Sequence, residues 1–346
     1  MANIKNVLVV KLSAIGDVIH ALPVSYAIKE TYPDARITWV VEPPAYDILK
    51  DNPYIDNIII FEKKKFKSFK GFLKNYGPFS KIIRADRYDA SLDLQGLFKS
   101  AAIVWNAKAR IRLGTCNMRE MSHKISRPVI GPNARGHIVE RYLDVARALG
   151  CRVENVVFPM EITERDKIAA EGAMQQEGAR MENPYVVLAV GANWPNKRWP
   201  TRYYAQLSDW LYGLKIIPVI IGGGAVDGQL AYDIESAAEI PPINLVGKTS
   251  LKQLAYIIQN AQAVVGGDTG PVHLSAGLGK PTVMVMGPTD ANRNGPYGQL
   301  ENAIEANRPC KYCWKRACPK GLECLSVIHP DAVEKKLLPL LKNNQR

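Results

Sequence analysis

The sequence predicts an α/β protein made of two doubly wound domains, each built on a parallel sheet. Short apolar runs alternate with helical patterns through the first half of the chain, and the alternation restarts after Pro184. Between the halves, residues 161–183 are polar, charged and glycine-containing. A length of 346 residues also suits two cores better than one. We therefore expect domains over residues 1–165 and 166–346.

The first domain contains four apolar runs that predict buried strands, over residues 7–10, 37–41, 58–61 and 90–94. Helical spacing predicts helices over residues 18–29 and 137–148, and Gly150 is a typical stop for the second of these helices. Strands that alternate with helices indicate βαβ units, in which the strands run parallel.

The second domain repeats this pattern. Strands are predicted over residues 185–190, 215–221, 244–246, 263–265 and 282–286. Helices are predicted over residues 163–178, 201–212, 225–238, 251–260 and 270–278. A final helix at the C-terminus is expected to pack back on the first domain. Ligands of open parallel sheets bind where the strands end, so the residues just after each strand are the candidate site residues.

The composition favours an anionic partner. Lys and Arg number 45 against 33 Asp and Glu, a formal charge of +12. The densest basic segment, residues 63–74, interleaves lysines with Phe66, Phe69 and Phe72. This segment is either a solvated face or a contact with an anionic lipid surface or a phosphorylated acceptor. Because the charge is spread along the chain without a recognised binding module, a nucleic-acid partner ranks last.

The N-terminus and the lack of long apolar runs bear on location. No run approaches the ~18 residues of a membrane span, and the first residues show neither a signal-peptide core nor a cleavage site. We expect a cytoplasmic protein, with peripheral contact to the inner membrane left open.

The junction after the first strand, residues 11–17, ends in Gly16 and Asp17. Gly16 permits a tight turn, and Asp17 falls at the start of the next helix. Asp17 is either an N-terminal cap or a general base for an incoming hydroxyl group. The Gly-x-Gly-x-x-Gly pattern of dinucleotide sites is absent here.

A second junction, residues 268–274, enters a helix after the strand over 263–265. Asp268, Thr269 and Gly270 precede Pro271, which suits the first turn of a helix. Free N–H groups and the helix dipole favour a diphosphate at such a position, and His273 lies one turn further on. The alternative is an ordinary capped helix with a core histidine.

A third junction, residues 191–200, offers Gly191 and Lys197, and Lys197 could neutralise the charge that develops on a departing phosphate. Trp194 and Trp199 either pack or touch a ligand. The glycines at 222–224, followed by Asp227, form a weaker candidate for close approach to a nucleotide.

Taken together, these segments resemble the lipopolysaccharide heptosyltransferases, inverting enzymes of glycosyltransferase family 9. The resemblance covers most of the chain and is carried by residues 10–20, 93–100, 119–120, 137–141, 268–274 and 286–290. It implies the GT-B architecture, in which two Rossmann-like domains face a cleft. It also implies transfer of L-glycero-D-manno-heptose from ADP-heptose to the Kdo of the inner core, Kdo2-lipid A, without a cofactor.

The resemblance further implies roles for single residues. Asp17 matches the catalytic base, and Lys197 matches a lysine beside the donor phosphates. We expect the donor to be bound by Gly191, Lys197, Asp227, Asp268, Thr269, Gly270 and His273. For the ribose-binding glutamate of the family, Asp227 is only the nearest acid. We expect the acceptor to be bound by Ser13, Gly16, Lys64, Gln95 and Arg119.

Residues 93–100 and the Arg119–Glu120 pair look more like the enzyme that adds the first heptose. The alternative is the enzyme that adds the second, since similar cysteine runs occur in its relatives. More remote alternatives are a nucleotide-sugar epimerase, a transferase of another sugar, and an NAD(P)-dependent oxidoreductase with Glu42 as ribose-binding acid.

Four of the six cysteines lie together near the C-terminus: Cys310, Cys313, Cys318 and Cys324. Disulfides are disfavoured in a cytosolic chain, so one interpretation is a structural thiolate site for zinc or iron. The other is a loop with four reduced thiols. Only the first pair has the two-residue spacing of a zinc knuckle.

Overall fold

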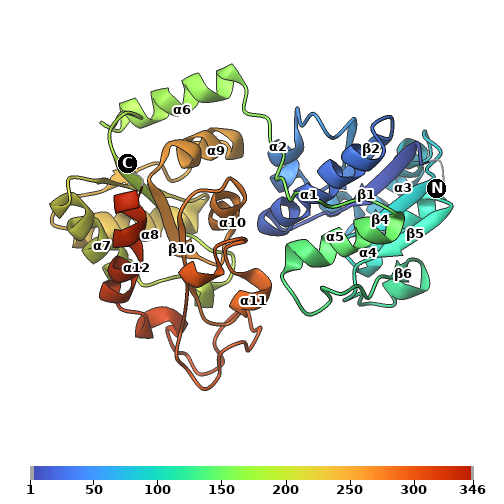
Figure 1. Cartoon of the computed structure of the whole chain (residues 1–346). Coiled ribbons are helices and arrows are strands. Elements are labelled where there is room, and N and C mark those ends of the chain that lie inside the picture. Colours follow the sequence, from blue (N-terminus) through green and yellow to red (C-terminus); the bar gives the residue numbers. More distant parts are fainter. Residues whose placement is uncertain (1–3, 344–346) are drawn as a thin grey trace. The chain divides into compact units, whose positions relative to one another are not determined.

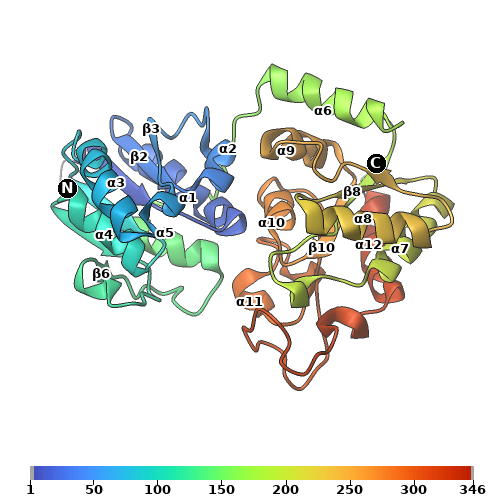
Figure 2. The same ribbon diagram turned by 180° about the vertical axis from the view of Figure 1, so that it is seen from behind.

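The structure, a computed structural model, describes residues 4–343, and the chain divides into a first compact unit ending at Glu161 and a second beginning at Ile162. The predicted division after residue 165 falls in the first turn of helix α6 (Glu164–Gln176). Figures 1 and 2 show a twisted sheet in each unit with helices on both of its faces. None of the helices in the described part of the chain is long and apolar enough to cross a bilayer.

The first unit has a six-stranded sheet in which every pairing is parallel, with strand order β3-β2-β1-β4-β5-β6. Its strands are β1 Asn6–Val10, β2 Arg36–Val41, β3 Asn57–Ile60, β4 Ala90–Asp93, β5 Ile111–Gly114 and β6 Arg127–Pro128. Its helices are α1 Ile15–Thr31, α2 Tyr46–Leu49, α3 Phe69–Ile83, α4 Phe98–Ala107 and α5 Ile138–Leu149. The central strands are buried on both faces, which explains their continuous apolar runs.

The second unit repeats this plan, with strand order β12-β11-β10-β7-β8-β9 and parallel pairings throughout. Its strands are β7 Tyr185–Ala189, β8 Ile217–Ile221, β9 Ile243–Asn244, β10 Ala263–Gly267, β11 Thr282–Met286 and β12 Ala303–Glu305. Its remaining helices are α7 Thr201–Gly213, α8 Ala225–Ala237, α9 Leu251–Asn260, α10 Gly270–Gly277, α11 Ala291–Asn294 and α12 Pro330–Asn343.

The C-terminal helix α12 belongs to the core of the second unit. Val333, Leu337 and Leu341 are buried there, and α12 packs against α7 and the strands β10 and β11 (Figure 1). The indole of Trp199 lies in the same core and donates a hydrogen bond to the carbonyl of Ile328 (2.8 Å). Trp199 is therefore a packing residue.

The strand order reverses direction at one place in each sheet. In the first unit this switch lies between β1 and β4, and in the second between β7 and β10. Loops leave such a pair in opposite directions, which opens a crevice at the carboxyl ends of the two strands. The loops that follow β1, β4, β7 and β10 carry most of the candidate residues.

Candidate functional site

Asp17 lies in the first turn of α1, directly beyond β1. Its Oδ2 accepts a hydrogen bond from the backbone N–H of Ala14 (3.1 Å), which is the capping interaction. The side chain nevertheless stays 41% exposed, and its Oδ1 lies 3.8 Å from the ammonium of Lys11. Both interpretations of this residue are thus compatible: the carboxylate caps the helix and still presents an oxygen to solvent.

Lys11 lies beside Asp17 in the candidate site, although no pattern in the sequence points to it. Its side chain is only 3% exposed, and Nζ donates to the hydroxyl of Tyr142 (2.8 Å) and to the carbonyl of Leu94 (3.2 Å). Burial alone would lower the pKa of Lys11, but Asp17 and Tyr142 raise it, and the net pKa lies above its usual value. The lysine therefore remains a cation that compensates the charge of Asp17.

Gln95 joins the two loops of this switch point. Its Oε1 accepts hydrogen bonds from the backbone N–H groups of Leu12 (3.0 Å) and Ser13 (3.1 Å). The preceding Asp93 is fully buried, and its Oδ1 accepts from the N–H groups of Gln95 and Gly96. Burial raises the pKa of Asp93, although these hydrogen bonds oppose the shift. The loop after β4 thus holds the backbone of Leu12 and Ser13, in the loop that leads to Gly16 and Asp17.

The two basic residues expected to bind the acceptor lie on the surface. Arg119 is exposed. Its backbone N–H donates a hydrogen bond to the carbonyl of Gly96 (2.8 Å), so its backbone lies next to the loop that contains Gln95. Lys64 is exposed in the short 3-10 helix η2 (Lys63–Phe66). In residues 4–343 neither side chain takes part in the hydrogen bonds around Asp17.

In the second unit, Asp268 lies directly beyond β10 and gathers three other side chains. The ammonium of Lys197 donates to Oδ2 (2.6 Å), the hydroxyl of Thr289 donates to the same oxygen (2.6 Å), and His273 Nε2 lies 2.9 Å from Oδ1. Burial alone would raise the pKa of Asp268, but His273 and Lys197 hold it well below its usual range. The group is therefore an ionised carboxylate whose two oxygens are both engaged.

A glycine makes this cluster possible. Lys197 ends the 3-10 helix η4 (Pro195–Lys197), and a Cβ atom at Gly267 would collide with the backbone carbonyl of Lys197. With glycine at this position, η4 lies directly on the end of β10 and Lys197 reaches Asp268. The ammonium of Lys197 also lies 4.5 Å from the ring centre of Trp194, a cation–π contact that helps hold the lysine.

The helix α10 begins at the same place. Thr269 is its N-terminal cap residue, and Pro271, which has no N–H, occupies its first turn. Within the described chain, no hydrogen bond is donated by the backbone N–H of Thr269 or Gly270. These N–H groups and the helix dipole favour an anion beside Lys197.

Asp227 occupies a different position, in the first turn of α8. Its Oδ2 accepts a hydrogen bond from the N–H of Gly223 (2.8 Å), which closes the loop after β8. A Cβ atom at Gly191 would collide with this carboxylate. The structure thus brings Gly191 and Asp227 together at the end of β7, and gives Asp227 a hydrogen bond that stabilises the loop.

The four C-terminal cysteines line one pocket with Asn196, Arg308 and Lys315. Burial and the neighbouring thiols raise the pKa of Cys324, whereas backbone hydrogen bonds from Leu322 and Lys320 lower that of Cys318. In residues 4–343 no three His, Cys, Asp or Glu side chains are arranged to hold a metal ion. Of the two interpretations, the structure does not support the zinc or iron site, because the thiols line a pocket without the tetrahedral arrangement that such a site needs.

Comparison with known proteins adds independent findings. A family model described as glycosyltransferase family 9 (heptosyltransferase) matches residues 77–323. Lipopolysaccharide heptosyltransferase 1 of Pseudomonas aeruginosa is 30% identical over 323 residues, which cover 90% of this chain and 87% of that protein.

Solved structures share the fold. The crystal structure of a family 9 glycosyltransferase from Veillonella parvula has a TM-score of 0.85 at 24% identity and covers 98% of each chain. The Escherichia coli ADP-heptose lps heptosyltransferase II has a TM-score of 0.78 at 23% identity, covering 99% of this chain and 100% of the other. The predicted fold class, two Rossmann-like domains of the GT-B type, is confirmed.

Proposed function

This chain belongs to glycosyltransferase family 9, and from that premise we propose that it transfers a heptose from ADP-heptose to the inner core of lipopolysaccharide. The chain is a glycosyltransferase of the heptosyltransferase family, and the sugar, the nucleotide and the acceptor are the content of the proposal. They agree with the names of two similar proteins, lipopolysaccharide heptosyltransferase 1 and ADP-heptose lps heptosyltransferase II.

One observation carries the proposal: the two switch points have opposite chemical character. The first unit presents the half-exposed carboxylate of Asp17, and the second presents the ammonium of Lys197 beside the free N–H groups that begin α10. A hydroxyl acceptor needs a base, and a sugar diphosphate donor needs positive charge and N–H donors. Each unit supplies one of these requirements.

The proposed reaction is a single displacement at the anomeric carbon. Asp17 accepts the proton of the acceptor hydroxyl as its oxygen bonds to that carbon. The bond from the anomeric carbon to the ADP oxygen breaks on the opposite side, so the configuration inverts. ADP leaves with the electron pair, and Lys197 and the N–H groups of Thr269 and Gly270 stabilise its negative charge.

Within this proposal Asp268 acts through its neighbours. A carboxylate beside a diphosphate would repel it, but both oxygens of Asp268 are already engaged by Lys197, Thr289 and His273. Asp268 is therefore a positioning residue that aims Lys197, and the cluster can take a donor phosphate on the remaining N–H groups of the lysine.

The proposed acceptor is the Kdo of Kdo2-lipid A, which carries carboxylates. Lys64 and Arg119 are exposed cations of the first unit and suit an acidic sugar. The alternative acceptor is the mono-heptosylated core. Since both acceptors are assembled on a lipid, we propose a cytoplasmic enzyme that works at the inner membrane surface.

The proposal is tested by incubating the purified protein with ADP-heptose and each acceptor. The products are identified by mass spectrometry. We expect one added heptose on Kdo2-lipid A and none on the mono-heptosylated core. Addition to the mono-heptosylated core alone would assign the second-heptose reaction instead. No transfer to either acceptor would contradict the proposed function.

A further inference from the structure

Helix α3 (Phe69–Ile83) buries its apolar face at only one end. Near its C-terminus, Ser80 and Ile83 are buried, and Phe79 packs on Phe61 and Phe66 of the domain core. Three and four residues apart along the helix, the same face continues through Phe69, Phe72, Leu73 and Tyr76. These four side chains are exposed, Phe69 by 78% and Leu73 by 62%.

The N-terminal part of α3, which carries these exposed side chains, is well formed. The hydroxyl of Ser68 accepts a hydrogen bond from the N–H of Gly71 (3.1 Å), which caps the start of the helix. The rings of Phe72 and Tyr76 stack at 5.1 Å. The apolar face is therefore held ready as a preformed surface.

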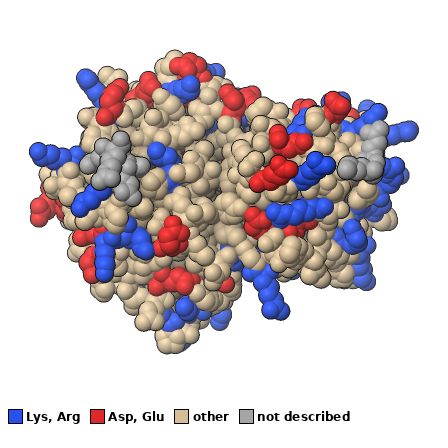
Figure 3. All heavy atoms as spheres, viewed as in Figure 1, with Lys and Arg blue, Asp and Glu red and all other residues tan. Residues whose placement is uncertain are grey.

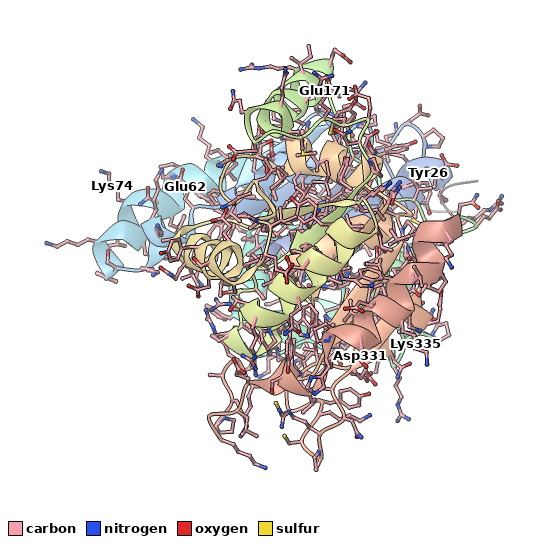
Figure 4. All side chains as sticks on the ribbon, turned by 90° about the vertical axis from the view of Figure 1, so that its left-hand side faces the viewer. Tyr26, Glu62, Lys74, Glu171, Asp331 and Lys335 are labelled. Atoms are coloured by element: carbon pink, nitrogen blue, oxygen red, sulfur yellow. The ribbon has the colours of Figure 1, made fainter. Side chains whose placement is uncertain are left out.

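Lysines surround this face. Residues 62–84 hold the cations Lys63, Lys64, Lys65, Lys67, Lys70, Lys74, Lys81 and Arg84, with Glu62 as their only acid. Glu62 pairs with Lys65 (2.5 Å), which leaves the other cations in excess. Figure 4 shows Lys74 reaching away from α3, and Figure 3 shows Lys and Arg side chains along the edge of the first unit where α3 lies in Figure 1.

We propose that α3 docks this enzyme on the surface of a bilayer that contains anionic phospholipids. A phosphorylated molecule in solution would need the lysines alone, but it gives no reason to expose Phe69, Phe72 and Leu73. A bilayer surface meets both requirements: its headgroups attract the lysines and its interfacial region accepts the apolar side chains. The surface is here called the α3 face, made of Phe69, Lys70, Phe72, Leu73, Lys74 and Tyr76.

Flotation of the full-length protein with vesicles tests the proposal. We expect binding to vesicles of phosphatidylethanolamine and phosphatidylglycerol, weak binding to phosphatidylcholine vesicles, and release at high salt, where charges are screened. No substrate is present, so the result is independent of sugar transfer. Transfer activity without vesicle binding would overturn this inference alone, and vesicle binding without transfer would overturn the proposed function alone.

Two double variants separate the apolar and the charged parts of the α3 face. Phe69→Ser/Leu73→Ser and Lys70→Gln/Lys74→Gln should each lower the vesicle partition coefficient by about tenfold or more. Matched controls are Ile130→Ser, an 81% exposed apolar side chain of the first unit, and Lys335→Gln/Lys342→Gln on α12. Both controls should bind vesicles as the parent protein does.

A water-soluble, deacylated acceptor completes the test. The α3 variants should transfer heptose to it at the parental rate, because the site around Asp17 is intact. Equal vesicle binding by parent and variants would overturn the inference. Self-association that the Phe69→Ser/Leu73→Ser variant abolishes, without vesicle binding by the parent, would also overturn it and assign the α3 face to contact between copies.

Discussion

Asp268 and Lys197 form an ion pair whose two side chains differ in their exposure to solvent. The side chain of Asp268 is 4% exposed, whereas that of Lys197 is 13% exposed and keeps access to solvent. Removing the charge of a buried carboxylate leaves its cation uncompensated. This lowers the free energy of unfolding by about 3–5 kcal/mol when both partners are buried. Because Lys197 is partly exposed, we expect a cost near or below the lower end of that range.

The variant Asp268→Asn should therefore unfold more easily than the parent at neutral pH, by at most about 3 kcal/mol. The pKa of Asp268 is lower in the folded than in the unfolded state, so its stabilisation is complete above about pH 4 and declines as the pH falls further. Denaturant titrations from pH 8 to pH 3 should show a constant difference in unfolding free energy at high pH and a shrinking one below about pH 4. A difference that persists unchanged to pH 3 would contradict the assigned charge.

At the scale of elements, the two loops of the second switch point depend on close backbone contact. The backbone of Gly191 lies against the carboxylate of Asp227, and the backbone of Gly267 lies against the carbonyl of Lys197. Neither glycine has a positive φ, so both are required by space and not by backbone conformation. The position of η4, and with it the ammonium of Lys197, follows from the missing side chain at 267.

The substitution Gly267→Ala tests this dependence. The added methyl group must displace η4, so we expect a loss of about 1–3 kcal/mol in unfolding free energy and a rise of about tenfold in the KM for ADP-heptose. Gly172→Ala in α6 is the matched control, since a Cβ atom there meets nothing within 4 Å. The control should keep the parental KM and gain about 0.5–1 kcal/mol. An unchanged KM in Gly267→Ala would refute the role of this contact.

The elements that the sequence predicts well are those buried on both faces. The runs over 7–10 and 282–286 are continuous apolar segments, and they correspond to β1 and β11 within a residue or two. The strands β5, β6 and β12 are not predicted by the sequence, because each is only two to four residues long and at least two of its side chains are partly exposed, which leaves no apolar run. For α3 the sequence predicts only a basic segment, since its apolar residues lie between lysines.

The candidate site also contains residues that the sequence predicts and residues that it does not. Asp17 and Asp268 were found because each follows a strand and precedes a helix, a local pattern. The pair of Lys197 with Asp268 spans 71 residues, and no periodicity connects them. The sequence does not predict a role for Lys11 because a lysine is usually exposed, whereas here Asp17 and Tyr142 stabilise its charge in a buried position.

At the scale of the whole molecule, the proposed catalysis uses fixed positive charge from the protein. In that proposal, the ammonium of Lys197 and the N–H groups at the start of α10 stabilise the leaving ADP. We therefore expect initial rates of heptose transfer to stay within about twofold when EDTA is added. Loss of activity in EDTA that Mg²⁺ restores would assign the stabilisation of ADP to a metal ion instead.

In the proposed mechanism the second unit binds the donor and the first unit supplies the base. All residues proposed to bind ADP-heptose lie after Ile162, and the proposed base lies in the first unit. A change confined to Asp17 should accordingly leave donor affinity intact while it stops the chemical step. Asn at position 17 keeps an oxygen that can accept from the N–H of Ala14, so the cap is retained while the basic group and its charge beside Lys11 are lost.

The most direct measurement compares Asp17→Asn with the parent protein in three readouts: thermal unfolding, ADP-heptose affinity by calorimetry, and single-turnover transfer to Kdo2-lipid A. We expect unchanged affinity, a lower unfolding temperature because the buried ammonium of Lys11 loses the compensating charge of Asp17, and a transfer rate lowered by at least ~100-fold in the folded protein. A parental transfer rate in a folded, donor-binding Asp17→Asn protein would contradict the assignment of Asp17 as the base.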